Sequence, residues 1–267
     1  MNPPATLRAL ALAPARLAYT LWSALAFLGV GLSALVLLAV LPGLARRRAA
    51  ARAAARAFLR LVGMPLTVRF PEHIPPGQCV VVCNHASYLD GIVLTAALPP
   101  RFGFVIKREM ATVPLAGVVL RRLGSEFVER FNRQRGAADA RRVLRNASTG
   151  HSLVFFPEGT FTRTPGLLKF HTGAFATAMR AGCPVVPAVV RGTRRALPPS
   201  GALPLPGALE LQILTPLAPA AVPDSAPELR DRARAAILTA LGEPDLTCCA
   251  DTARPPDTAR ERSARAS

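Results

Sequence analysis

Residues 79–90 read CVVVCNHASYLD, and this stretch decides the fold class of the chain. Its five apolar residues, Cys79–Cys83, predict a buried strand. Ser87 and Asp90 have the spacing of a helix capping box, so we expect a helix to begin near Ser87. A buried strand that leads directly into a helix is the repeating unit of α/β proteins.

The same alternation of short apolar strands and helices continues from residue 64 to residue 242. It predicts an α/β domain built as a three-layer mixed sheet flanked by helices. The expected strands are Leu66–Phe70, Cys79–Cys83, Phe102–Ile106, Glu126–Glu129, Leu153–Phe156, Val185–Val190 and Leu209–Leu214. The expected helices are Tyr88–Ala97, Pro114–Leu123, Ala137–Ser148, Gly173–Ala181 and Pro227–Leu241.

A long apolar run precedes this domain. No charged residue occurs over the 29 positions Leu17–Ala45, whereas about 20 residues suffice to cross a bilayer. A cleaved signal peptide has a shorter apolar region of about 7–15 residues. We therefore expect residues 1–45 to form a retained, membrane-embedded helical anchor. Gly29 and Gly31 leave two forms open, a single span and a membrane-inserted hairpin.

Basic charge gathers beside the apolar run. The net charge of +17 implies an anionic partner. Residues 1–60 contain eight arginines and no acidic residue, which favours a lipid surface. Two of these arginines precede the run and six follow it, so the positive-inside rule predicts an inner (cytoplasmic) membrane protein whose domain faces the cytoplasm. Sparse aromatic residues and the lack of RNP, KH or zinc patterns argue against nucleic acid.

Residues 46–63 are predicted to form a basic juxtamembrane helix. Four arginines recur in it at every fourth position: Arg48, Arg52, Arg56 and Arg60. On a helix they form one stripe. Like charges at this spacing disfavour an isolated helix, and anionic lipid headgroups would relieve the repulsion. A helix face that is merely solvated is the alternative.

The remaining features are a tail and five cysteines. Residues 243–267 are polar and rich in Pro, Arg and Asp, which predicts a disordered C-terminal tail. The cysteines show no spacing typical of metal ligands, and two of them lie in apolar runs. They are interpreted as reduced structural thiols of a cytoplasmic domain, and no metal site is expected.

His85 and Asp90 are the first candidates for chemistry. His85 directly follows the strand Cys79–Cys83, and the C-terminal ends of strands are where α/β folds place their sites. The two side chains can meet only if His85 lies in the turn and Asp90 in the first helical turn. A carboxylate that holds one imidazole nitrogen leaves the other able to accept a proton from an alcohol. In the alternative, Asp90 only caps the helix and His85 is an ordinary loop residue.

Three further segments carry candidate residues. Residues 156–163 read FPEGTFTR and follow an apolar strand, so this loop can offer backbone amides and a guanidinium to an anion. Arg130 ends the segment Gly124–Arg130 and could bind a phosphate with two hydrogen bonds. Val185–Val190 predicts a buried strand that contains a proline, for which core packing is the default interpretation.

In order and spacing, these four segments resemble the glycerolipid acyltransferase family, which includes 1-acyl-glycerol-3-phosphate acyltransferase. That family has an NHxxxxD box, a GxxFxxR-like box, an FPEGT box and a VPxxx box. The matching segments are Asn84–Asp90, Gly124–Arg130, Phe156–Thr160 and Val186–Val190. The resemblance covers about residues 64–215, and finding the first and third boxes together is the specific part of it.

The resemblance implies a role for each matched residue. His85 would be the general base and Asp90 its partner. The residues that would bind the glycerol phosphate of the acceptor are Lys107, Arg130, Glu158, Gly159, Thr160 and Arg163. The implied reaction moves a fatty acyl group from acyl-CoA or acyl-carrier protein to 1-acyl-glycerol 3-phosphate, giving phosphatidic acid. The implied partners are membrane lipid and these substrates, with no metal or other cofactor.

Three positions depart from the family pattern. Phe161 stands where the family often has arginine, Thr162 where serine is common, and Glu129 where aspartate is usual. These changes leave the acceptor open between the expected one and glycerol 3-phosphate, a lyso-ornithine lipid or another lysophospholipid. An inactive lipid-binding relative and a nucleic-acid-binding module are the alternatives from other functional classes.

Overall fold

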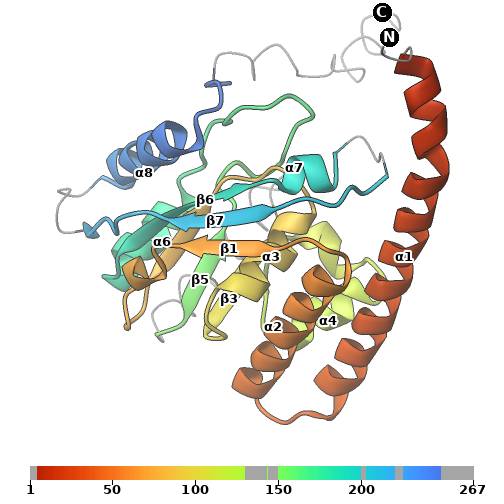
Figure 1. The fold of residues 1–267 in the computed structure, drawn as a ribbon. Coiled ribbons are helices and arrows are strands. Elements are labelled where there is room, and N and C mark those ends of the chain that lie inside the picture. Colours follow the sequence, from red (N-terminus) through yellow and green to blue (C-terminus); the bar gives the residue numbers. More distant parts are fainter. Residues whose placement is uncertain (1–4, 130–142, 144–149, 200–202, 220–224, 248–267) are drawn as a thin grey trace, which may run out of the picture.

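The fold alternates strands and helices as the sequence predicts (Figure 1). The computed structural model describes residues 5–129, 143, 150–199, 203–219 and 225–247. The strands are β1 (Leu66–Arg69), β2 (Val80–Cys83), β3 (Phe102–Lys107), β4 (Glu126–Val128), β5 (Ser152–Phe155), β6 (Val185–Arg191) and β7 (Leu209–Ile213). The helices are α1 (Ala5–Val40), α2 (Leu44–Leu61), α3 (Leu89–Ala97), α4 (Ala116–Arg122), α6 (Gly173–Ala181), α7 (Thr193–Ala196) and α8 (Ala226–Leu241), with 3₁₀ turns η1 (Pro71–His73) and η2 (Arg108–Ala111).

All seven predicted strands are confirmed to within one residue at either end. The sheet has the order β1-β7-β6-β2-β5-β3-β4. Every neighbouring pair is parallel except β6 and β7, which run antiparallel. The mixed sheet is therefore confirmed. The predicted helix Ala137–Ser148 lies, apart from Val143, outside the described residues.

Helices cover both faces of the sheet, which confirms the three layers. Successive side chains of a strand point to opposite faces. Val81 and Cys83 accordingly pack into the core under α2 and α3, whereas Val80 and Val82 pack against α6 and α8. A strand that is buried on both faces has no position that favours a polar residue. This is why apolar and polar residues do not alternate in the run Cys79–Cys83.

The three central strands carry three of the four matched boxes. β2 leads into His85, its neighbour β5 leads into the FPEGT box, and its other neighbour β6 is the VPxxx strand. Because β2 and β5 run parallel, their C-terminal ends meet at one edge of the sheet. The topology thus brings together boxes that lie about 70 residues apart along the chain.

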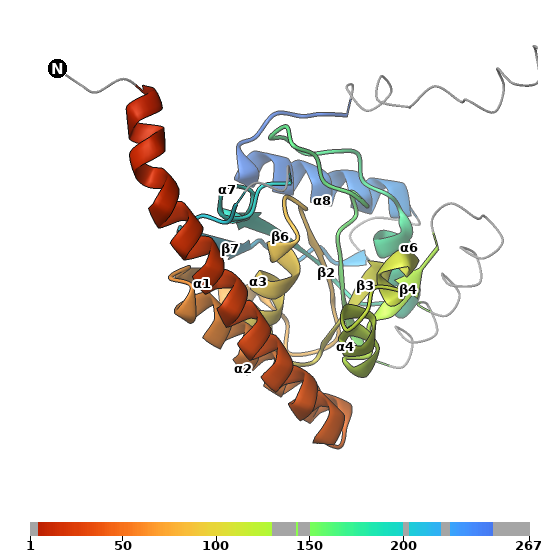
Figure 2. The ribbon, with the colours of Figure 1, turned by 90° about the vertical axis from the view of Figure 1, so that its right-hand side faces the viewer.

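α1 is one continuous helix that passes through Gly29 and Gly31, so the chain does not turn back at these glycines. The chain reverses at residues 41–43, and α2 then packs back along α1 (Figure 2). Two aromatic side chains of α1 tie the pair together at the C-terminal end of α2. Tyr19 donates its hydroxyl to the carbonyl of Val62, and Trp22 donates its indole N–H to that of Leu61, both at 2.8 Å.

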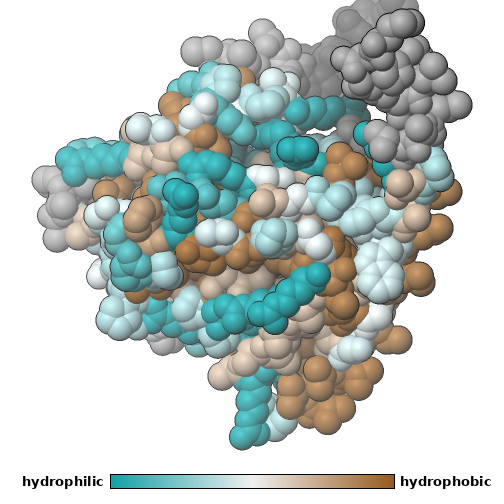
Figure 3. All heavy atoms as spheres, viewed as in Figure 1, coloured by the Kyte–Doolittle hydropathy of each residue, from teal (hydrophilic) through white to brown (hydrophobic). Residues whose placement is uncertain are grey.

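The outward face of α1 is apolar and exposed along most of its length (Figure 3). Its exposed large side chains are Leu17, Leu21, Trp22, Leu25, Phe27, Leu28, Leu32, Val36, Leu37 and Val40. Among the residues that the structure describes, α1 supplies one segment, Pro14–Val40, that is long and apolar enough to cross a membrane.

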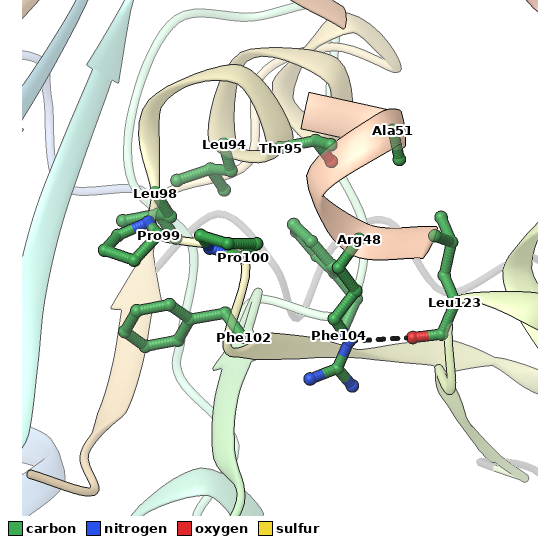
Figure 4. A pocket seen from close by; sticks show the side chains of 10 residues that line it. All are labelled: Arg48, Ala51, Leu94, Thr95, Leu98, Pro99, Pro100, Phe102, Phe104 and Leu123. Carbon is green, nitrogen blue, oxygen red and sulfur yellow. Dashed lines mark hydrogen bonds between the residues drawn. The ribbon is translucent and has the colours of Figure 1, made fainter. Parts of the chain in front are cut away.

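The predicted basic stripe of α2 begins with a side chain that faces the protein. Arg48 is buried and donates hydrogen bonds to the carbonyls of Leu123 at 3.0 Å and Arg101 at 2.8 Å (Figure 4). Its guanidinium closes one side of a small cavity of about 30 Å³ between α2, α3 and β3. Arg48 therefore satisfies backbone acceptors of the domain and does not meet lipid.

The next two arginines of the stripe also face the domain. Arg52 donates to the carbonyl of Ala97 at 3.2 Å, and Arg56 donates to that of Ala96 at 2.8 Å. Both carbonyls end α3, where the helix dipole favours a cation. Residue spacing therefore predicts that these arginines share one side of α2, but it does not show that α3 lies against part of that side. Arg56 and Arg60 remain exposed.

Replacing Arg48 with methionine is expected to destabilise the protein by about 3 kcal/mol, because buried carbonyls would lose a charged donor. Thermal unfolding of the detergent-solubilised protein measures this loss. The matched control is Arg60→Met, because Arg60 lies on the same helix and is exposed. Equal melting temperatures for the two variants would contradict the capping role of Arg48.

Candidate active site

His85 and Asp90 meet at the C-terminal end of β2. The imidazole Nδ1 lies 2.8 Å from the carboxylate Oδ2 of Asp90. His85 lies in the turn after β2, and Asp90 lies in the first turn of α3. This is the arrangement that the sequence predicts for the pair. The side chain of His85 is 18% exposed and that of Asp90 is fully buried, so only the imidazole can be reached from solvent.

Asp90 is fixed by the turn that it caps. Its Oδ2 also accepts the backbone N–H of Ala86 at 2.7 Å and that of Ser87 at 2.9 Å. Three donors on one oxygen hold the carboxylate in one orientation. Asp90 is therefore both a helix cap and the partner of His85, so the two interpretations of the sequence do not exclude each other.

Asn84 anchors the turn to the neighbouring strand. Its side-chain oxygen accepts the N–H of Val190 at 2.8 Å, and its amide donates to the carbonyl of the same residue at 3.1 Å. Val190 belongs to β6, so this pair joins the NHxxxxD box to the VPxxx box. Sequence reasoning assigned no role to Asn84, although an asparagine that ends an apolar strand is a signal for such an anchor.

Glu158 holds the turn from the other side. It is buried, and its two oxygens accept the backbone N–H of His85 at 2.6 Å and that of Leu168 at 2.8 Å. The carboxylate thus faces the backbone beneath the imidazole. Burial raises the pKa of Glu158 to about 7, against the opposing effect of these two hydrogen bonds.

This raised pKa predicts how stability changes with pH. Because the folded-state pKa of about 7 exceeds the ordinary carboxyl value, the unfolded chain loses this proton first as pH rises. Glu158 should therefore make the protein about 1 kcal/mol more stable at about pH 6 than at about pH 8. Melting temperatures of wild type and Glu158→Gln over this range measure the effect. The variant should lose this part of the pH dependence, and an identical dependence in both proteins would contradict the assignment.

The other predicted binding residues lie around the same edge of the sheet. Lys107 ends β3, and the exposed Thr160 and Arg163 follow β5, the neighbour of β3. Gly159 has a φ of +74°, which favours glycine, and it donates its N–H to the carbonyl of Phe156. Arg130 lies outside the described residues.

A pair of charged residues that sequence reasoning missed supports the FPEGT loop. Arg194 donates to the carbonyls of Thr162 at 2.6 Å and Thr164 at 3.1 Å. Its partner Glu243 lies 3.4 Å away and accepts the N–H of Gly166 at 2.6 Å. The pair joins segments that are far apart in the sequence, and no local motif marks it.

Comparison with known proteins shows the family of the chain. The model of the Acyltransferase family matches residues 65–191. The human 1-acyl-sn-glycerol-3-phosphate acyltransferase alpha is 32% identical over 186 residues, which cover 68% of this chain and 66% of that protein. The chain belongs to the glycerolipid acyltransferase family.

Two more members of the acyltransferase family are informative. The lyso-ornithine lipid O-acyltransferase of Pseudomonas aeruginosa is 34% identical over 139 residues, 51% of each chain. The chain thus spans less than two thirds of the length of these sequence relatives. The crystal structure of the 1-acyl-sn-glycerophosphate (LPA) acyltransferase from Thermotoga maritima shares the fold, with a TM-score of 0.73, 21% identity, and coverage of 92% of this chain and 99% of that one. An apolar helix of spanning length in a member of this family indicates membrane association.

Aromatic rings enclose the imidazole of His85. Phe156 stacks on the His85 ring with centroids 4.3 Å apart, and Phe161 meets the same ring edge-on at 4.5 Å. Tyr88 in turn contacts Phe161 at 4.9 Å. Phe161 therefore occupies the space beside His85, at a position where the family pattern often has arginine. Two ring contacts and the Asp90 bond fix the imidazole plane, so Nε2 is the atom left to meet a substrate.

Proposed function

We propose that this protein is an O-acyltransferase that acylates the free hydroxyl of 1-acyl-glycerol 3-phosphate and so forms phosphatidic acid. The observation that carries the proposal is the 2.8 Å contact between the His85 imidazole and the buried carboxylate of Asp90. The family supports the class of reaction, and the relatives named for this acceptor support the substrate.

The proposed reaction starts with the acceptor hydroxyl within hydrogen-bond reach of His85 Nε2. Nδ1 keeps its proton and donates it in a hydrogen bond to Asp90. The neutral imidazole therefore has a free lone pair on Nε2. Nε2 takes the hydroxyl proton as the oxygen attacks the thioester carbonyl, and Asp90 stabilises the imidazolium. The C–S bond of the tetrahedral intermediate then breaks, the imidazolium returns the proton to the leaving thiolate, and the new ester stays on the acceptor.

Direct transfer is favoured over an acyl-enzyme. Ser87 is buried and donates its hydroxyl to the carbonyl of Leu197 at 2.7 Å, so the hydroxyl is held away from a nucleophilic role. The thiols of Cys79, Cys83 and Cys183 are buried and unpaired. Burial raises the pKa of the Cys79 thiol to about 11, and burial also raises the pKa of the Cys83 thiol. Both shifts disfavour the reactive thiolate.

For the phosphate of the acceptor, we propose a cationic rim at the edge of the sheet. Lys107 and Arg163 would supply the charge and Thr160 a hydroxyl, since all three are exposed there. Arg130 belongs to the same proposal on the basis of its box. Glu158 and Gly159 would act on this site by shaping the backbone, because their polar groups already bond to other main-chain groups.

One observation favours a second candidate acceptor. The aromatic ring of Phe161 lies against His85, where an arginine would have brought a positive charge. A headgroup with less negative charge, such as that of a lyso-ornithine lipid, would fit a site that has phenylalanine at position 161 better than a site that has arginine there. The Pseudomonas aeruginosa relative named for that acceptor supports this alternative.

We further propose that α1 holds the protein on the inner (cytoplasmic) membrane, with the domain in the cytoplasm. The six arginines that follow the apolar run support this orientation. Because α1 packs along α2 instead of leading away from the domain, its exposed apolar face would lie within one leaflet, as an interfacial helix does. Substrate and product would then remain in the bilayer beside the site.

A panel of acceptors tests the proposed function. The purified protein is incubated in phospholipid vesicles with labelled acyl-CoA or acyl-carrier protein and with each lyso-lipid in turn. We expect phosphatidic acid from 1-acyl-glycerol 3-phosphate to form fastest, and EDTA to leave the rate unchanged. Faster acylation of a lyso-ornithine lipid would favour the second candidate, and no acylation of any acceptor would contradict both.

A further inference from the structure

The segment between η2 and α4 carries an exposed apolar tip. Leu115 is 65% exposed, and Val113 and Val118 beside it are 41% and 42% exposed. α4 packs next to α1, and Figure 2 shows the two helices side by side. The exposed apolar tip therefore belongs to a part of the domain that neighbours α1.

The backbone of the tip is strained. Leu115 has φ 61° and ψ −53°, and the N–H of Ala116 bonds to the carbonyl of Pro114 at 2.6 Å. These values describe a γ-turn of positive φ, which is a rare and strained conformation. For a leucine such a backbone is unfavourable, and it persists only when the surrounding structure imposes it.

The surrounding structure does impose it. The backbone of Gly117 packs so closely on Ala111 that a Cβ at position 117 would lie 2.3 Å from the Ala111 carbonyl oxygen. That oxygen also accepts a hydrogen bond from Arg121 at 2.8 Å. Since η2 and α4 are locked together on either side, Leu115 is held outward on a rigid turn.

Basic side chains flank the tip. Arg121 and Arg122 in the last turn of α4 are exposed, as is Lys107, which ends β3 just before η2, and these three cations exceed the one exposed acid of η2, Glu109. An apolar tip bordered by cations matches the interface of an anionic bilayer, where acyl chains lie beneath negative headgroups.

We propose that Val113, Leu115 and Val118 form a second lipid-contacting surface, which inserts into the anionic leaflet beside α1. This inference rests on the proposed membrane-bound function and adds to it a second point of contact. Two separated contacts fix the tilt of the domain, whereas α1 alone would leave it free to rotate about the helix axis. The edge of the sheet that carries His85 would thereby be held at the lipid surface.

The test is the binding of the full chain to vesicles of equal parts phosphatidylcholine and phosphatidylglycerol. Leu115→Gly removes the apolar side chain and relieves the positive φ, so it should raise the melting temperature and weaken vesicle binding by about tenfold. Leu115→Asp should weaken binding at least as much, and Leu115→Trp should retain it. Turnover of a short-chain acceptor dissolved as monomers should stay at the wild-type rate in all three.

The chain offers a matched control in Phe70, the other non-glycine residue with positive φ among those described. Phe70 is also exposed, at 44%, and directly follows β1, a strand that does not pack against α1. Phe70→Gly should relieve strain in the same way and leave vesicle binding unchanged. If Leu115→Gly binds vesicles as tightly as wild type, the second contact is overturned and the proposed function is not. If the wild-type protein itself does not bind vesicles, the proposed membrane location is overturned as well.

Discussion

The His85→Ala variant should transfer acyl groups about a thousandfold more slowly than wild type, because it lacks the imidazole proposed to accept the proton of the hydroxyl. The His85 side chain makes few structural contacts besides Asp90 and the rings of Phe156 and Phe161, so the fold should persist. The rate of phosphatidic acid formation measures the first effect, and vesicle flotation with circular dichroism measures the second.

The control for this variant is His151→Ala, which removes an exposed imidazole elsewhere in the chain. It should keep the wild-type rate and vesicle binding. His85 is not the general base if the His85→Ala variant is folded, binds vesicles and transfers acyl groups at the wild-type rate. Loss of vesicle binding together with activity would instead point to a structural role for His85.

The second large effect is expected from Asp90→Asn, which should lower the transfer rate at least about a hundredfold. An amide oxygen can still accept the N–H groups of Ala86 and Ser87, but the side chain no longer carries a charge to stabilise the imidazolium. If the NH₂ group took the place of Oδ2 instead, it would face Nδ1 and favour the wrong imidazole tautomer. Steady-state kinetics should therefore show a fall in kcat with a smaller change in KM.

The matched control for Asp90→Asn is Asp231→Asn on α8, whose carboxylate is exposed and pairs with Arg230. It should leave kcat unchanged. A surviving kcat in folded Asp90→Asn would mean that the carboxylate acts only as a helix cap. Retained melting temperature in that variant separates the chemical role from the capping role.

The sheet could be predicted because its signals are local. Runs such as Val80–Cys83 are short, apolar and bounded by turns, which leaves few other structures open to them. The start of α4 was less predictable. A helix was expected from Pro114, yet it begins at Ala116, because the chain first makes the γ-turn at Leu115. That turn depends on the contact between Gly117 and Ala111, and no local sequence pattern predicts this contact.

The same division holds at the site. The contact between His85 and Asp90 could be predicted because both residues lie within one turn of chain, where spacing limits the geometry. The bond from His85 to Glu158 spans 73 residues, and the sequence predicted a substrate role for that glutamate without showing its burial beneath the turn. The direction of the arginines on α2 was likewise set by carbonyls contributed from α3 and α4.

The account depends most on direct transfer, in which the imidazole of His85 activates the acceptor and no protein group carries the acyl chain. A rapid-quench experiment with labelled acyl donor, performed first without acceptor and then with 1-acyl-glycerol 3-phosphate, tests this claim. We predict no labelled protein in either reaction, and release of thiol only as phosphatidic acid appears. Stoichiometric acylated protein and a burst of thiol before acceptor is added would contradict it.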